Sequence, residues 1–313
     1  MRDGDLKRLL ADAKGSVGLD DRIMLHAIPV GYAVDGANGV RDPRGLHGKL
    51  LGVRMHLMTA ARPVVQNLVT VLGRCHLQIA DLVASPYAAG LASLVEDETD
   101  LGVTVIDMGG GTTSFSVFYD GAPVFTDCVP VGGQHVTSDI ARGLSTPLAH
   151  AERLKTLHGS ALPSASDEKE MLDAPQIGEE EEGGPNRVPK SFLVSIIAPR
   201  LEETFELVRQ RLERSGAASI AGQRVVLTGG ASQLTGAREV AGRVLGKTVR
   251  VGRPLGISGM AEATGGPAFT TVSGLLHFAV DDRGEARATV ARPQAEPRGG
   301  FIGRLGGWLR ENF

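Results

Sequence analysis

An aspartate and three consecutive glycines end an apolar strand in VIDMGGGTTSFSVF, residues 105–118. Glycine reaches positive φ angles freely and lets the backbone come within hydrogen-bond distance of a ligand. Consecutive N–H groups in such a turn form a cradle for an anion, to which Thr112 and Thr113 add hydroxyl donors. Asp107 is placed to hold Mg²⁺ through water. A loose hairpin turn also explains a lone glycine triplet, and by itself the triplet favours that simpler interpretation.

A second turn also places glycines at the end of an apolar strand. In VVLTGGASQLTGA, residues 225–237, glycines again follow an apolar strand and precede a helix. Ligands of open α/β sheets bind at such strand ends. Neither turn contains the G-x-x-x-x-G-K-[ST] or G-x-G-x-x-G pattern, so neither a Walker lysine nor a dinucleotide fingerprint is present. Together the two turns favour a nucleotide's phosphates and their metal ion as the ligand.

The composition is that of an ordinary globular chain of 313 residues, long enough for two or three domains. A net charge of −3 gives no indication of nucleic-acid binding. Cys75 and Cys128 lack metal-ligand spacing, which predicts buried thiols in a reducing compartment. With no signal peptide and no long apolar run, we expect a cytoplasmic chain.

Hydrophobic periodicity predicts alternating strands and helices, and scarce aromatic residues with abundant glycine favour an α/β protein. The predicted helices are 5–13, 62–75, 85–98, two within 136–158 split at Thr146-Pro147, 192–216 and 266–280. Predicted strands are 50–60, 77–85, 101–108 and two after the glycine triplet, and 224–246 is a strand, turn and helix. Residues 159–189 are predicted as an acidic solvated loop.

The two turns resemble those of the actin, sugar-kinase and heat-shock-chaperone superfamily. There, 105–118 is similar to the second phosphate loop and 225–237 to the adenosine loop. SPYAAGLASLVEDE and GPAFTTVSGLLHFA resemble its two connecting helices. The order of pieces, with VPVGGQHVTSDIARGL, AERLKTLHG and the C-terminal tail, resembles the bacterial cell-division family FtsA from about residue 2 to residue 313.

This resemblance implies an α/β, actin-like (ribonuclease-H-like) fold of two lobes, the first incomplete, with a C-terminal amphipathic helix. The expected units are 1–59, a small family-specific subdomain; 60–100, the rest of the first lobe; 101–156, the nucleotide-binding core; 157–223, a partner-binding subdomain; 224–265, second-lobe core with the adenosine loop; 266–280, a closing helix; 281–298, a flexible linker; and 299–313, a membrane-targeting helix.

The sequence departs from the family at its start. The family opens with a first phosphate loop, an Asp-x-Gly-Thr/Ser hairpin, and no such hairpin occurs here. We therefore expect an N-terminally truncated chain, either natural or with a misplaced start, that exposes a sheet edge and apolar helix faces. Each lost phosphate contact is worth roughly 1.5–3 kcal/mol, so weak nucleotide binding and marginal folding are expected.

The resemblance implies ATP or ADP with Mg²⁺ as ligands and assigns the site residues. Asp107 would serve the metal, and the nucleoside would lie against the second turn. The phosphates would be wrapped by Gly109, Gly110, Gly111, Thr112 and Thr113, and the nucleoside would contact Gly229, Gly230 and Ala231. Glu152 and Lys155 would face the ribose or base, although a surface i,i+3 pair explains them equally well.

The tail sequence FIGRLGGWLRENF has the spacing of an amphipathic helix. Its apolar residues fall at i, i+1, i+4, i+7 and i+8 and share one face: Phe301, Ile302, Leu305, Trp308 and Leu309. Arg304 and Arg310 flank this face. The pattern favours a helix lying on an anionic membrane surface, with docking on the protein's own body or on a partner as the alternative. Three glycines weaken the helix, so stable attachment needs several tails on one assembly.

The implied function is an ATP-binding protein, with at most slow hydrolysis, that tethers the FtsZ ring to the cytoplasmic face of the inner membrane at the division site. It would also self-associate into polymers and recruit later division proteins. Among the arginines of the helix at 192–216, Arg200 is favoured to receive the acidic C-terminal tail of FtsZ, because arginine forks bind carboxylates bidentately. The alternative is a sugar- or acetate-type kinase, for which no catalytic carboxylate stands out.

Overall fold

A five-stranded sheet forms the centre of this computed structural model, which describes residues 1–178 and 186–280. Its strand order is β10-β9-β4-β5-β6. β4 (Val103–Met108), β5 (Thr113–Tyr119) and β6 (Ala122–Val129) make an antiparallel meander, while β9 (Arg224–Thr228) and β10 (Thr248–Val251) run parallel to β4. The sheet is therefore mixed, with its parallel part formed by segments distant in the sequence.

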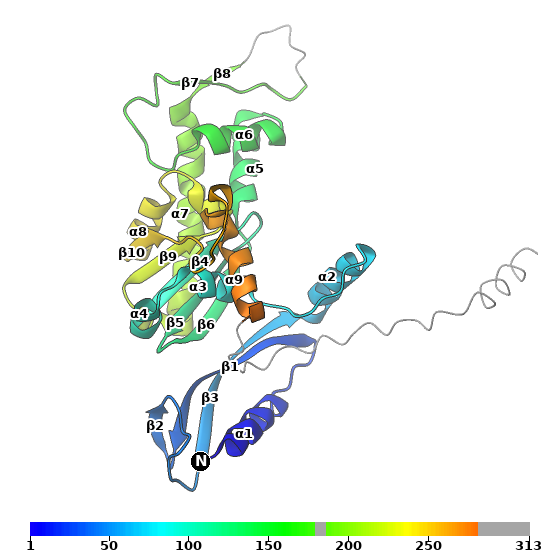
Figure 1. Cartoon of the computed structure of the whole chain (residues 1–313). Coiled ribbons are helices and arrows are strands. Elements are labelled where there is room, and N and C mark those ends of the chain that lie inside the picture. The colour runs from blue at the N-terminus through cyan, green and yellow to red at the C-terminus, as the bar shows by residue number, and fades with distance from the viewer. Residues whose placement is uncertain (179–185, 281–313) are drawn as a thin grey trace, which may run out of the picture.

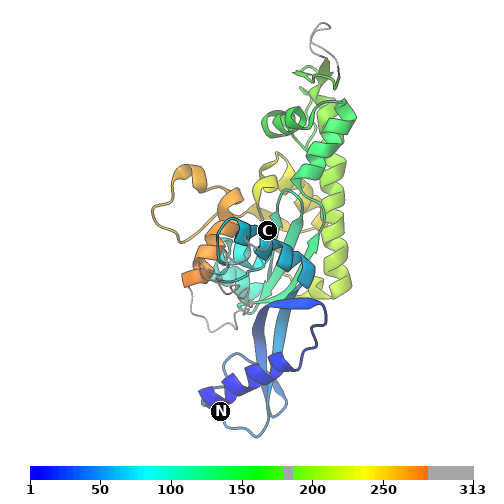
Figure 2. The same ribbon diagram turned by 90° about the vertical axis from the view of Figure 1, so that its right-hand side faces the viewer.

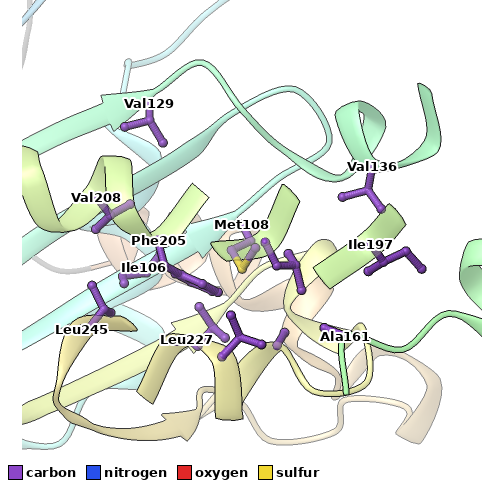
Figure 3. Close-up of a cluster of buried hydrophobic side chains, with 14 of the residues drawn as sticks. Ile106, Met108, Val129, Val136, Ala161, Ile197, Phe205, Val208, Leu227 and Leu245 are labelled. Carbon is purple, nitrogen blue, oxygen red and sulfur yellow. The ribbon is translucent and has the colours of Figure 1, made fainter. Parts of the chain in front are cut away.

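Helices cover both faces of this sheet, because side chains alternate between the faces of a strand. Ile106 and Met108 of β4 pack with α7 (Lys190–Ser215), α5 (Gly133–Leu144) and α8 (Ala237–Leu245) in the larger core cluster (Figure 3). Val103 and Val105 point to the other face. There they meet α3 (Ser85–Ser93) and α9 (Thr270–Val280), which lie against each other.

A small N-terminal unit lies beyond one end of the central sheet (Figure 1). It consists of α1 (Asp3–Gly15), β1 (Arg22–Val34), β2 (Ala37–Val40) and β3 (Leu51–Ala61), and α2 (Arg62–Arg74) follows it. The three strands form one sheet of order β2-β1-β3. His56 of β3 hydrogen bonds Thr126 of β6 at 3.1 Å, and the buried His26 ring packs edge-on against Tyr87 and Phe278. These contacts attach the unit to the central sheet and to the α3–α9 pair.

At the opposite end, α6 (Leu148–His158) and a two-stranded sheet of β7 (Met171–Asp173) and β8 (Arg187–Pro189) lie near one end of α7 (Figure 2). The remaining helix is α4 (Glu96–Leu101), and the short 3-10 turns are η2 (Ala217–Ser219), η3 (Gly230–Gln233), η4 (Glu262–Thr264) and η5 (Pro267–Phe269). Buried Glu98 of α4 binds Arg250 of β10, joining this helix to the sheet edge.

Most sequence-predicted elements are confirmed, including the helices at 62–75 and 192–216 and the split of 136–158. The predicted strand at 77–85 is wrong. Its backbone N–H groups at Leu82 and Ala84 instead bond the Asp81 carboxylate and His26 Nε2, and no strand is assigned there. The predicted helix 85–98 breaks at Leu94, whose backbone is extended. Pro199 lies inside α7. The strands β1, β2 and β10 were not anticipated, nor were β7 and β8, which lie in the segment 159–189 that was predicted as a loop.

The prediction of buried thiols is also wrong. Cys75 and Cys128 are both free and exposed, because Cys75 directly follows α2 and Cys128 lies on the edge strand β6. The expectation of exposed apolar helix faces is confirmed. Apolar side chains more than a third exposed lie on α2 and on α9: Val64, Leu68, Val71, Val272, Leu275, Leu276 and Val280.

Candidate functional site

A cavity of about 990 Å³ opens at the carboxyl end of β4 and β9. Because Asp107 pairs with Thr228 in parallel register, the segments that follow both strands leave the sheet at the same edge. The cavity therefore joins the two glycine turns that the sequence singled out. Its lining includes Gly109 and Gly110 of the first turn, Gly230 and Ala231 of the second, and residues of α5 and α6.

The first glycine turn is held against the start of α5. The Gly133 N–H donates to the carbonyl of Gly109 at 2.9 Å, and the Gln134 N–H donates to that of Gly110 at 2.8 Å. A Cβ on Gly132 would lie 2.6 Å from both of these carbonyl oxygens, so only glycine fits there. Sequence reasoning missed Gly132 and Gly133 as site residues. A glycine pair directly before a helix was the signal that could have identified them.

The second turn needs glycine where it passes over the end of β4. Gly229 has φ +87°, and a Cβ there would approach both the Asp107 Oδ1 and the Met108 carbonyl to 2.5 Å. Gly229 itself is not among the lining residues, but the residues after it, Gly230 and Ala231, are. The two turns are thus in direct contact behind the cavity.

Asp107 does not line the cavity, although Met108, Gly109 and Gly110, which follow it in the chain, do. Its Oδ2 accepts a hydrogen bond of 2.9 Å from the Thr271 hydroxyl of α9. Burial raises the pKa of Asp107, and the Thr271 hydrogen bond opposes that rise. Mg²⁺ commonly binds one or two carboxylates together with waters and substrate phosphates, so a single carboxylate fits that ion. Within the described residues, no group of three or more His, Cys, Asp or Glu could enclose a metal.

The other predicted members of the first turn do not line the cavity. Gly111 and Thr112 are exposed at the tip of the turn. Thr113 is fully buried, and its hydroxyl donates to the carbonyl of Val131 at 2.8 Å. Its side chain therefore supports the turn from within the fold and does not point its hydroxyl at a ligand.

Glu152 and Lys155 of α6 both line the cavity. The Lys155 ammonium donates to Glu152 Oε2 at 2.7 Å, to the Thr137 hydroxyl at 2.9 Å and to the carbonyl of Gly133 at 3.1 Å. Burial acts to raise the pKa of Glu152, but hydrogen bonds from Lys155 and Thr137 outweigh it and lower that pKa. Lys155 thus connects α6 to the α5 start that holds the first turn.

Arg200 lies apart from the cavity lining and is already paired within the protein. Its guanidinium donates through two nitrogens to the Asp139 carboxylate, one of them at 3.1 Å, and also binds Glu203. The Asp139 hydrogen bond raises the pKa of Arg200. The Arg200 side chain is 26 % exposed.

The predicted membrane-binding residues lie outside the described residues: Phe301, Ile302, Arg304, Leu305, Trp308, Leu309 and Arg310. The same holds for the predicted linker at 281–298. Among the described residues, no helix combines the length and the apolarity needed to cross a bilayer.

The fold of this chain is similar to that of actin-like proteins of known structure. MreB5 of Spiroplasma citri, solved bound to ADP, is matched with a TM-score of 0.53 and 17 % identity, over 70 % of this chain and 64 % of that one. A chain of the PilM-PilN type IV pilus biogenesis complex is matched with a TM-score of 0.59 and 18 % identity, over 89 % and 73 % of the two chains. At such identities the likeness concerns the fold alone.

Sequence comparison is more specific. Residues 104–274 match the family described as cell division protein FtsA, and residues 2–59 match the SHS2 domain inserted in FtsA. Cell division protein FtsA of Rhizobium meliloti (strain 1021) is 48 % identical over 99 % of this chain and 70 % of its own length. That of Escherichia coli (strain K12) is 35 % identical over 99 % of this chain and 74 % of its own. This chain belongs to the FtsA family of cell division proteins.

Proposed function

We propose that the protein binds ATP or ADP in the cavity between its two glycine turns. The observation that carries this proposal is the meeting of two strand-end glycine turns at one cavity of about 990 Å³. Backbone N–H groups of such turns supply positive partial charge for phosphate, and the start of α5 holds the first turn in place through the carbonyls of that turn. The MreB5 structure, which shares the fold, was solved with ADP.

Within this site each predicted residue has a distinct role. Gly109 and Gly110 would contact phosphate through the backbone, with Gly111 and Thr112 at the exposed tip and Thr113 supporting the turn. Gly230 and Ala231 would contact the nucleoside, with Gly229 shaping that turn, and Glu152 and Lys155 would face the ribose or base. Asp107 would hold Mg²⁺ through water, and the ion would neutralise phosphate charge.

In the cell, we propose that the nucleotide-bound protein tethers the FtsZ ring to the cytoplasmic face of the inner membrane at the division site. Polymers of the protein would present many amphipathic tails at 299–313 to the membrane and would recruit later division proteins. Family membership and the amphipathic spacing of the tail support this role. The FtsZ tail would have to displace Asp139 and Glu203 to reach Arg200.

ATP binding tests the proposal directly. Gly230 has open space, since a Cβ there would meet only the Ala268 Cβ at 4.0 Å. A Gly230→Leu side chain would fill the nucleoside end of the cavity, so ATP affinity should fall at least about tenfold while the melting temperature is kept. Gly73→Leu, on exposed α2, is the control. Calorimetry that finds no ATP binding to the unaltered chain at millimolar ATP, or equal binding by Gly230→Leu, would overturn the proposal.

A further inference from the structure

The first two residues of α9 each bond the end of a different central strand. The Thr270 and Thr228 hydroxyls are 2.8 Å apart, which attaches α9 to the end of β9. The Thr271 hydroxyl donates to Asp107 Oδ2 at 2.9 Å, which attaches it to the end of β4. Thr270 is fully buried, whereas Thr271 is half-buried. The two neighbouring threonines therefore bond different strands, Thr270 as acceptor from the Thr228 hydroxyl and Thr271 as donor to the charged Asp107 carboxylate.

We propose that Thr271 is a positioning residue that orients the Asp107 carboxylate toward a Mg²⁺ ion bound with the nucleotide, an inference that depends on the proposed function. Thr271 occupies Oδ2, and Oδ1 is the oxygen nearest Gly229 and the second turn, since a Cβ on Gly229 would lie 2.5 Å from it. The hydrogen bond thus fixes which carboxylate oxygen faces the second glycine turn.

A hydroxyl suits this position for a chemical reason. A lysine or arginine partner would neutralise the carboxylate and weaken its attraction for a cation, whereas a neutral hydroxyl orients the carboxylate and leaves its charge intact. Partners that orient a metal-binding carboxylate from behind commonly change metal affinity by about 10–100-fold when they are removed. Thr271 has the geometry of such a partner, since it bonds Asp107 from α9 and does not line the cavity.

The test compares ATP affinity of the full chain in Mg²⁺ with that in EDTA, by calorimetry. Thr271→Val keeps the side-chain shape and removes the hydroxyl, so the gain in affinity from Mg²⁺ should fall about tenfold while the EDTA affinity is unchanged. Thr271→Ser keeps the hydroxyl and should restore the gain. Thr270→Val removes the acceptor of the hydrogen bond from Thr228 of β9, and it should lower the melting temperature without changing the gain in ATP affinity from Mg²⁺.

The outcomes separate this inference from the nucleotide site itself. Suppose that Mg²⁺ raises the ATP affinity of the unaltered chain. If Thr271→Val then keeps this increase, or Thr271→Ser loses it, only the role of Thr271 is overturned. ATP binding with no Mg²⁺ gain also overturns only that role. No ATP binding in either buffer overturns both proposals. Thr271→Ala replaces Thr271→Val if the valine variant shows no cooperative melting.

Discussion

Gly132 lies directly against the carbonyl of Gly109, so that a Cβ on Gly132 would come within 2.6 Å of that oxygen. The contact joins the start of α5 to the glycine turn after β4, and both glycines line the cavity. Hydrogen bonds from the Gly133 and Gln134 N–H groups also attach the start of α5 to this turn. The first turn is therefore shaped by the helix behind it as well as by its own glycines.

Gly132→Ala should shift the first turn and destabilise the protein. Overpacking of this kind costs typically about 1–3 kcal/mol, and the displaced turn should also weaken ATP binding. Urea unfolding followed by circular dichroism measures the stability. The control is Gly73→Ala, where a Cβ meets nothing within 4 Å. Equal unfolding midpoints for the two variants would contradict the close approach at Gly132.

Lys155→Met should loosen the attachment of α6 to the start of α5, because Lys155 donates to Glu152, Thr137 and Gly133. Loss of these hydrogen bonds leaves Glu152 without its cation and frees the start of α5. Since bonds that involve a charged group are worth about 1.5–3 kcal/mol each, we expect ATP affinity to drop about tenfold or more. Exposed Lys169→Met is the matched control. If calorimetry finds that Lys155→Met binds ATP as tightly as the unaltered protein, Glu152 and Lys155 are not part of the nucleotide site.

The strand, glycine turn and helix plan was predictable because each element carries its own hydrophobic period. The contacts between distant segments were not. Nothing in the local pattern near Asp107 indicates Thr271, which is 164 residues away. The segment 77–85 has an apolar pattern like that of a strand, yet no neighbouring strand pairs with it. Solvent exposure of Cys128 likewise follows from the edge position of β6, which only the assembled sheet defines.

His56 should make stability depend on pH. Burial, with a smaller effect of His26, lowers the pKa of His56 from 6.5 to about 4. The unfolded chain therefore binds a proton at His56 before the folded chain does, and the free energy of unfolding falls as pH drops from about 6.5 to about 4. At about 1.4 kcal/mol per pKa unit, the full loss is roughly 3 kcal/mol.

The measurement is urea unfolding across this pH range. His56→Gln keeps a side-chain group that can hydrogen bond Thr126 but does not titrate, so its stability should decline less steeply than that of the unaltered protein. His47→Gln alters an exposed residue and should follow the unaltered protein. Parallel pH profiles for His56→Gln and the unaltered protein would show that the pKa of His56 is not lowered by the fold.

Arg200 offers a test of partner binding that follows from its internal pairing. If an acidic FtsZ tail peptide binds Arg200, it must compete with the Asp139 carboxylate. Asp139→Asn should therefore strengthen peptide binding severalfold, whereas Arg200→Glu should abolish it. Fluorescence anisotropy of a labelled acidic peptide measures both. Arg214→Glu, at the far end of α7, controls for a general change in charge. If Arg200→Glu and Arg214→Glu bind the peptide with equal affinity, Arg200 is not part of the peptide-binding site.

The sequence of the tail predicts that some changes weaken membrane binding and that others strengthen it. Deletion of residues 299–313 should abolish co-sedimentation with vesicles that contain anionic lipid, because it removes the apolar face of Trp308 and its neighbours. Alanine at both Gly306 and Gly307 should strengthen binding, since each glycine costs a helix about 1 kcal/mol relative to alanine. Trp308→Ala should weaken it, and neutral vesicles should bind less than anionic ones because Arg304 and Arg310 flank the face. Docking of the tail on the protein's own body predicts instead that deletion leaves sedimentation unchanged, which would refute the membrane role.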